Sequence, residues 1–266
     1  MSLPPYRVSA FNTAKASENK IHDDATARRF GFKGGFVGGV NVYAYMSHQP
    51  VQRWGRAWLE HGTGEARFAK PVYEGEIAEV SAVEDTAGLA LTVRSQGLLC
   101  ASGRADLPAA AEPVAVLDDF KAVPPRAERV AADEKSLAVG DWLGMVPLPV
   151  TAAHHAQDLA DLREADPIYL RDGILHPGTL LRCCNWVLTH NVILPAWIHM
   201  GSTVRNLGLA HAGDTLTVRA RVTKNYEHKG HKWVEIDALV VANETTPVIR
   251  ATHIAIYHPR QVAEAA

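Results

Sequence analysis

Two pairs of segments repeat in this chain at one constant spacing, and the repeat limits the possible folds more than any other feature. GFVGGVNVY, which begins at Gly35, aligns with GILHPGTLL, which begins at Gly173, and PVYEGEIAEV aligns with LAHAGDTLTV at the same offset of 138 residues. The first pair places a glycine before an apolar helical run, and the second places a glycine and an acidic residue at a turn between strands. Two features that differ in kind agree on one offset, so the sequence predicts one structural unit built twice.

The unit itself is a helix followed by antiparallel strands. An apolar helical pattern follows Gly39, and we expect Pro50 to end or kink this helix. From Gly64 onward the apolar period shifts toward two, with turn signals between the runs, which predicts antiparallel strands. In the second half a helical pattern starts near Thr179 and is again followed by alternating runs.

The composition changes between the two units. Residues 108–136 are rich in proline, alanine and charged side chains and show little apolar periodicity, which is typical of a linker. The sequence therefore predicts an N-terminal unit over residues 1–107, a linker over 108–136 and a C-terminal unit over 137–266.

Overall composition points to a small-molecule ligand. The 266 residues are 47% hydrophobic, and 27 Lys and Arg nearly balance 29 Asp and Glu, so no basic field attracts nucleic acid or an anionic membrane. No apolar run approaches the roughly 18 residues of a membrane span, and no targeting segment is recognisable, so we expect a soluble cytoplasmic protein. Nucleotide-binding glycine motifs and metal-ligand spacings are missing, which predicts no cofactor and no metal.

The cysteines fit a reducing compartment. Cys100, Cys183 and Cys184 are an odd set with no CxxC spacing. Two adjacent helical cysteines point about 100° apart, so we expect core packing rather than a nucleophilic role.

The segment from Ser17 to Gly39 collects polar residues and glycines and is the predicted site. Asp24 has the position of an N-cap for a short helix, which would place His22 just outside that helix. The glycines up to Gly38 and Gly39 then precede the apolar helix, whose first N–H groups can bind an anion or a polarised carbonyl.

The same segment resembles a known motif. ENKIHDD followed by GFKGGFVGG is similar to the pattern D-x-N-P-[LIV]-H-x-D of MaoC-like, (R)-specific enoyl-CoA hydratases. On that pattern His22 corresponds to the catalytic histidine, Asn19 to the asparagine and Asp24 to the later aspartate. Lys20 stands where proline is usual, and Ser17 stands where the family has its catalytic aspartate.

The resemblance, combined with the repeat, implies an α+β double hotdog fold. In this fold two antiparallel sheets, each wrapped around a central helix, pack edge to edge, and the fused units replace a homodimer. In the second half Glu164 and Tyr169 take the positions of the aspartate and the histidine. The first half is then the catalytic one, and the second half shapes the acyl tunnel.

The resemblance also implies an activity, the reversible hydration of a 2-enoyl thioester in fatty acid metabolism. His22 would be the base, with Ser17 and Asn19 ordering the water. Groups that could replace the absent aspartate are Asp23, Glu164 and His176. Residues expected to contact the substrate are Asp23, Gly35, Gly38, Gly39 and His176.

Two other functions stay open. A protein with this fold and without the aspartate could bind an acyl thioester without catalysis. A hotdog thioesterase would need a carboxylate on or beside the central helix, and the run from Val40 to Pro50 contains none. The expected partner is acyl-CoA or an acyl carrier thioester, and association of two chains into a homodimer is also left open.

Overall fold

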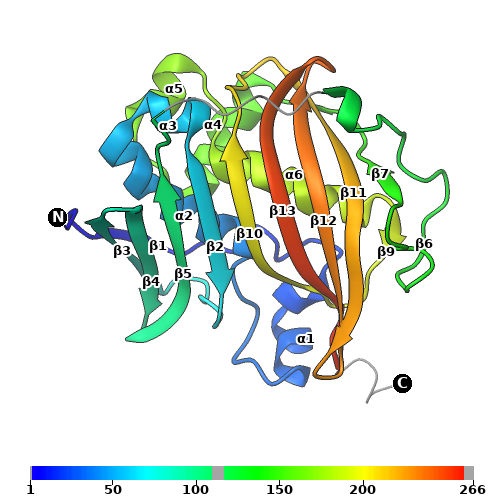
Figure 1. Ribbon diagram of the computed structural model, residues 1–266. Coiled ribbons are helices and arrows are strands. Elements are labelled where there is room, and N and C mark those ends of the chain that lie inside the picture. Colours follow the sequence, from blue (N-terminus) through cyan, green and yellow to red (C-terminus); the bar gives the residue numbers. More distant parts are fainter. Residues whose placement is uncertain (1, 110–116, 261–266) are drawn as a thin grey trace.

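Most strands form one large sheet in the computed structural model, which describes residues 2–109 and 117–260. Eleven strands join in the order β1-β3-β4-β5-β2-β10-β13-β12-β11-β7, with β8 also paired to β11 (Figure 1). The N-terminal unit supplies β1 (Tyr6–Ser9), β2 (Thr63–Phe68), β3 (Ile77–Asp85), β4 (Gly88–Ser95) and β5 (Leu98–Asp106). The C-terminal unit supplies β7 (Trp142–Gly144), β8 (Leu148–Pro149), β10 (Ile198–Asn206), β11 (Thr215–His228), β12 (His231–Ala242) and β13 (Thr246–His258).

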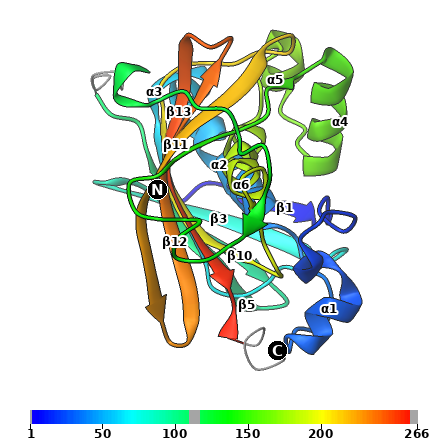
Figure 2. The ribbon, with the colours of Figure 1, turned by 90° about the vertical axis from the view of Figure 1, so that its right-hand side faces the viewer.

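The helices gather on one face of this sheet, except for the short η2, which packs with Phe120 against Leu239 and Val241 on the opposite face. Figure 2 shows the two central helices against the sheet, with α1 and α4 farther out on the same side. The helices are η1 (Lys20–His22), α1 (Asp24–Arg29), α2 (Gly39–Trp54), α3 (Arg56–His61), η2 (Leu117–Asp119), α4 (Ala152–Leu162), α5 (Pro167–Asp172) and α6 (Pro177–Thr189). Across the described parts of the chain, no helix combines the length and the apolar character needed to cross a membrane.

The internal repeat is confirmed in detail. The bridge between Phe36 and Tyr73 recurs 138 residues later as the bridge between Ile174 and His211. The central helices α2 and α6 begin at the same offset, and the strand order is symmetric about the contact between β2 and β10. That contact is antiparallel, so the two half-sheets join edge to edge as expected.

The two central helices fill the core. In α2 every residue from Val40 to Ser47 is buried, as expected for a helix covered on all sides. Burial raises the pKa of the Cys183 thiol in α6 to about 12, and it also raises the pKa of Cys184. Both thiols are therefore protonated core groups rather than nucleophiles, as predicted.

Of the two effects expected of Pro50, the end of the helix is not observed. Pro50 does not end the helix, which continues to Trp54. An interior proline costs about 3 kcal/mol, but Pro50 and Val51 are both buried against the core, and this burial outweighs the cost. The helix ends instead at Gly55, whose φ of 58° lies in the region that glycine tolerates best.

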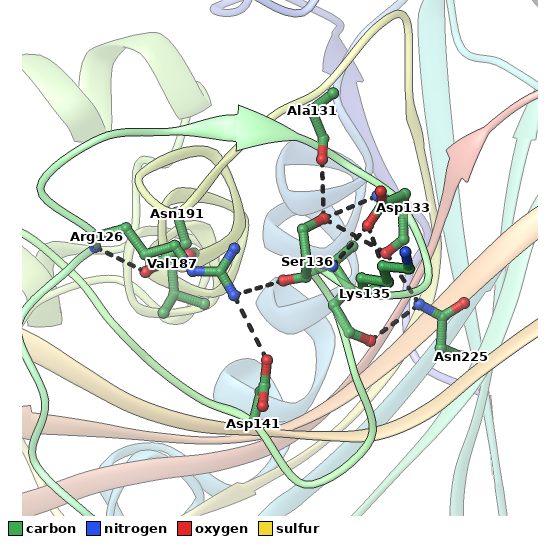
Figure 3. A network of polar contacts seen from close by, with 10 residues as sticks. Arg126, Ala131, Asp133, Lys135, Ser136, Asp141, Val187, Asn191 and Asn225 are labelled. Carbon is green, nitrogen blue, oxygen red and sulfur yellow. Dashed lines mark hydrogen bonds and ion pairs between the residues drawn. The ribbon is translucent and has the colours of Figure 1, made fainter.

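The described part of the predicted linker lies on the C-terminal unit. The strand β6 (Val130–Ala131) pairs in parallel with β9 (Val192–Ile193). The backbone N–H of Arg126 donates to Asn191 Oδ1 at 3.1 Å, and its guanidinium donates to the Ser136 carbonyl at 2.7 Å (Figure 3). Residues 110–116 of the linker lie outside the described residues, and the unit boundaries remain a prediction.

Candidate active site

A cavity of about 530 Å³ lies where the predicted site segment meets the C-terminal unit. The N-terminal unit lines it with residues that include Ser17, Asn19, His22 and Gly38. The C-terminal unit lines it with one face of α4 and one face of α6. The cavity therefore belongs to both units, and neither half forms it alone.

His22 ends the short helix η1 and is almost fully buried. Its Nδ1 lies 2.7 Å from the carbonyl oxygen of Phe36. Because a carbonyl can only accept, Nδ1 carries the hydrogen and Nε2 keeps its lone pair. Burial lowers the pKa of His22, and the hydrogen bond to Phe36 offsets part of that effect. The imidazole is therefore a neutral base at neutral pH.

The N-terminus of α2 is open beside His22. Gly38 is the N-cap and has no side chain to bond the first N–H groups of the helix. A Cβ at Gly38 would lie 3.8 Å from His22 Cε1, so the imidazole stands next to this turn. Gly39 faces a second cavity of about 240 Å³, where a Cβ would approach His199 and Phe68 below 3.0 Å.

Gly35 has a packing role in this segment. A Cβ at this position would lie 2.1 Å from the carbonyl oxygen of His22. Only glycine therefore lets the backbone at residue 35 pass this close to the backbone of His22. Its N–H donates to Asp24 Oδ1 at 2.9 Å and is not free for a ligand. The expected contact of Gly35 with substrate has no support in this geometry.

The predicted N-cap is wrong by one residue. Asp23, not Asp24, caps α1, and its carboxylate accepts from the Thr26 N–H at 3.0 Å. This hydrogen bond lowers the pKa of Asp23. Asp24 remains exposed and accepts instead from the Gly35 N–H. Asp23 is not among the residues around the cavity, so the substrate contact expected for it is not supported.

Asn19 connects the two units. Its Nδ2 donates to the Trp197 carbonyl at 2.9 Å, and its Oδ1 accepts from the Trp197 N–H at 3.2 Å. Both functions of the Asn19 carboxamide thus bond the backbone of Trp197. Of the two residues expected to order the water, only Ser17 has a side chain without such a strong partner. Ser17 lines the cavity, and its hydroxyl makes a long hydrogen bond of 3.5 Å to the Asn19 carbonyl.

The equivalent region of the second half is closed. His176 is the N-cap of α6, and its Nδ1 accepts from the Gly178 N–H at 3.1 Å. Its Nε2 faces the Glu164 carboxylate at 3.5 Å, and His48 Nδ1 approaches the same carboxylate at 3.1 Å. Tyr169 is fully buried beside His176. His176 and Glu164 therefore lie outside the cavity, contrary to the roles expected for them.

Four residues of the C-terminal unit, which the sequence did not single out, line the cavity opposite His22. They are Asp158 in α4, Arg182 and Asn185 in α6, and Trp197 before β10. Arg182 Nη1 donates to Asp158 Oδ1 at 2.6 Å, and the Thr179 hydroxyl donates to the other oxygen. Burial raises the pKa of Asp158, but Arg182 and Thr179 outweigh it and the pKa is lowered. In the sequence, Arg182 and Asn185 are polar residues three positions apart on the largely apolar helix α6, and this spacing could have indicated a polar site on one helix face.

The fold is a double hotdog. Neither a family model nor a curated protein matches the sequence. A solved structure from Chloroflexus aurantiacus, assigned as a MaoC domain protein dehydratase, is 11% identical with a TM-score of 0.64 over 97% of this chain and 95% of that chain. A Mycobacterium tuberculosis protein described as having a double hotdog fold is 16% identical with a TM-score of 0.63, over 96% and 95%.

Two further structures show the range of activities assigned to this fold. A MaoC-like dehydratase is 13% identical with a TM-score of 0.60, over 95% of this chain and 97% of that chain. A Lactobacillus plantarum protein assigned as an oleoyl thioesterase is 13% identical with a TM-score of 0.50, over 96% and 97%. Structural similarity at such low sequence identity establishes the fold alone. The activity has to be argued from the site.

Proposed function

We propose that this protein is an acyl-thioester hydratase or dehydratase that reversibly hydrates a 2-enoyl thioester. The observation that carries the proposal is the pairing of a neutral imidazole with an open helix N-terminus on one cavity wall. His22 offers the Nε2 lone pair as a base, and the uncapped first turn of α2 at Gly38 offers N–H donors.

The reaction can be written with this chain's own groups. His22 Nε2 removes a proton from water as the water oxygen bonds to C3 of the enoyl group. The C2–C3 π electrons move toward the thioester oxygen, which the N–H groups at the start of α2 stabilise. The imidazolium then returns the proton to C2. One water is added, His22 is restored, and the reverse sequence is dehydration.

In this proposal His22 is the single proton carrier, because the other groups considered for that role lie elsewhere. Asp23 caps α1, while Glu164 and His176 lie in the closed cluster of the second half. Ser17 remains at the cavity, where its hydroxyl can orient the attacking water but cannot act as an acid at neutral pH. Asn19 becomes a positioning residue that places Trp197 on the cavity wall.

Acyl-thioester binding without catalysis is the main alternative, and Ser17 in place of a carboxylate favours it. A thioesterase is the second alternative, since Asp158 lies beside α6. That carboxylate is bonded to both Thr179 and Arg182, and a lowered pKa makes it a weak base. CoA or an acyl carrier protein as the thioester carrier, and a place in fatty acid metabolism, are part of the proposal.

The test is a direct assay of the purified protein. Crotonyl-CoA and longer or branched 2-enoyl-CoAs should lose their conjugated thioester absorbance without release of free thiol, and His22→Ala should abolish that loss. Ser17→Asp, which restores a carboxylate at the cavity, should raise kcat. Thiol release would indicate a thioesterase. Binding of acyl-CoA with no turnover in any variant would replace the proposal with the binding-protein alternative.

A further inference from the structure

Three side chains around the cavity carry polar atoms with no partner. Among the described residues, Arg182 Nε and Nη2, Asn185 Oδ1 and Trp197 Nε1 are buried and make no hydrogen bond. All three residues line the same cavity as His22. A buried polar group left unpaired lowers stability, so a ligand that satisfies these atoms would gain affinity.

The guanidinium of Arg182 is held in place. Its Nη1 donates to Asp158, whose other oxygen accepts from Thr179. The side chains of Arg182 and Asp158 are only 15% and 7% exposed, so the pair is fixed before any ligand arrives. Asn185 follows three positions later on the same face of α6. Arg182 and Asn185, three positions apart on α6, thus provide a donor and an acceptor with unused hydrogen-bonding capacity.

The rest of the lining limits the ligand chemistry. The aliphatic side chains around the cavity are Ala14 and Val40, and the indoles of Trp186 and Trp197 add apolar surface, so the lining mixes apolar and polar groups. The charges are already balanced, because Asp158 neutralises Arg182 and Glu18 pairs with Arg129 at 2.7 Å, while Asp161 adds a negative charge. A carboxylate would enter an unfavourable field.

A neutral hydroxyl fits both unused functions. It can accept a hydrogen bond from Arg182 and donate one to the oxygen of Asn185. We propose that the acyl group of the substrate carries a hydroxyl beyond the reacting carbons, and that Arg182 and Asn185 recognise it. This inference rests on the proposed function, because it assumes that an acyl thioester occupies the cavity.

Calorimetric binding of saturated thioesters tests the inference apart from catalysis. The probes are butyryl-CoA, 4-hydroxybutyryl-CoA, hexanoyl-CoA, 6-hydroxyhexanoyl-CoA and succinyl-CoA, which cannot be hydrated. At least one hydroxyacyl-CoA should bind about tenfold more tightly than its alkyl counterpart. Arg182→Lys keeps the charge beside Asp158 but removes the two unused donors, and Asn185→Ala removes the acceptor. Each should bring the ratio of hydroxyacyl to alkyl affinity close to one, whereas Arg250→Lys, in the Asp237 pair outside the cavity lining, should leave that ratio unchanged.

The outcomes separate this inference from the proposed function. Equal binding of hydroxyacyl and alkyl thioesters would overturn the inference and leave acyl-thioester recognition standing. Tightest binding of succinyl-CoA would also overturn it, in favour of a carboxylate. A preference that survives both α6 variants would exclude Arg182 and Asn185 as its cause. No binding of any acyl-CoA would overturn both proposals together.

Discussion

The carboxamide of Asn19 bonds both backbone polar groups of Trp197, donating to its carbonyl oxygen at 2.9 Å and accepting from its N–H at 3.2 Å. The two residues are separated by 178 positions and belong to different units. This pair therefore links the segment that carries His22 to the wall that the second unit contributes.

Asn19→Ala should destabilise the protein by about 1–3 kcal/mol, because it leaves two buried backbone groups of Trp197 unpaired. The measurement is urea unfolding followed by tryptophan fluorescence. Ser17→Ala is the matched control two residues away, since its hydroxyl makes only a 3.5 Å contact, and it should change stability by less than about 0.5 kcal/mol. Equal effects of the two variants would show that the link to Trp197 contributes nothing.

His22→Ala should lower kcat by at least about 100-fold without unfolding the protein, because it removes the group that carries the proton. Hydration kinetics and circular dichroism are the measurements. His154→Ala, another histidine at the cavity, is the control and should retain activity. Loss of activity in both variants, or in neither, would contradict the role assigned to His22.

The pH dependence of hydration should follow the lowered pKa of His22. Burial favours the neutral imidazole, so the base form persists below the usual histidine value of about 6.5. The acid limb of the kcat profile is therefore expected below pH 6.5, with full activity above it. A limb at or above that pH would show that a different group, or a charged His22, controls the rate.

Gly35→Ala and Gly38→Ala should differ in their effect on stability, because a Cβ clashes with the loop backbone at Gly35 and does not clash at Gly38. At Gly35 the new Cβ would lie 2.1 Å from the His22 carbonyl oxygen, which must displace the loop and reduce both stability and kcat. At Gly38 the nearest atom is 3.8 Å away, an ordinary contact, so the fold should remain intact. Thermal unfolding and hydration kinetics decide the matter, and a larger loss of Tm at Gly38 would be inconsistent with this geometry.

Glu164→Gln should make the protein less stable at pH 7 and less sensitive to acid. Burial raises the pKa of Glu164, but His176 and His48 outweigh it and hold the pKa below its usual range. A lowered folded-state pKa stabilises the fold above the unfolded value and loses that contribution as pH falls below about 4.5. The difference from wild type should be about 1–3 kcal/mol at pH 7 and shrink toward pH 3.

Denaturant unfolding from pH 3 to pH 8 measures this dependence. Glu60→Gln provides the control, because Glu60 forms an exposed pair with Arg56 and should contribute less than about 0.5 kcal/mol. A difference between wild type and Glu164→Gln that stays constant with pH would mean that the ionised carboxylate is not the stabilising form.

The sequence was informative wherever local pattern and repetition determine structure. The 138-residue offset predicted two equivalent helices and two equivalent sets of strands; both are present, the strands as two halves of one sheet, and the bridge before each central helix recurs at the same offset. Glycines before α2 and buried thiols in α6 were also recognisable, because backbone approach and apolar periodicity act over a few residues. Pro50 does not end α2, and the N-cap of α1 is Asp23 rather than Asp24, since burial and loop closure outweighed local preference.

The candidate site depended on contacts that no local pattern contains. Asn19 meets Trp197 across the junction of the units, Glu164 and His176 close on His48, and Arg182 with Asp158 faces the His22 cavity. Hydrogen bonds and ion pairs of this kind require two distant segments to be held within a few ångströms. The sequence by itself determined the repeated unit, and only the packing of one unit on the other decided which polar groups surround the open cavity and which are sealed.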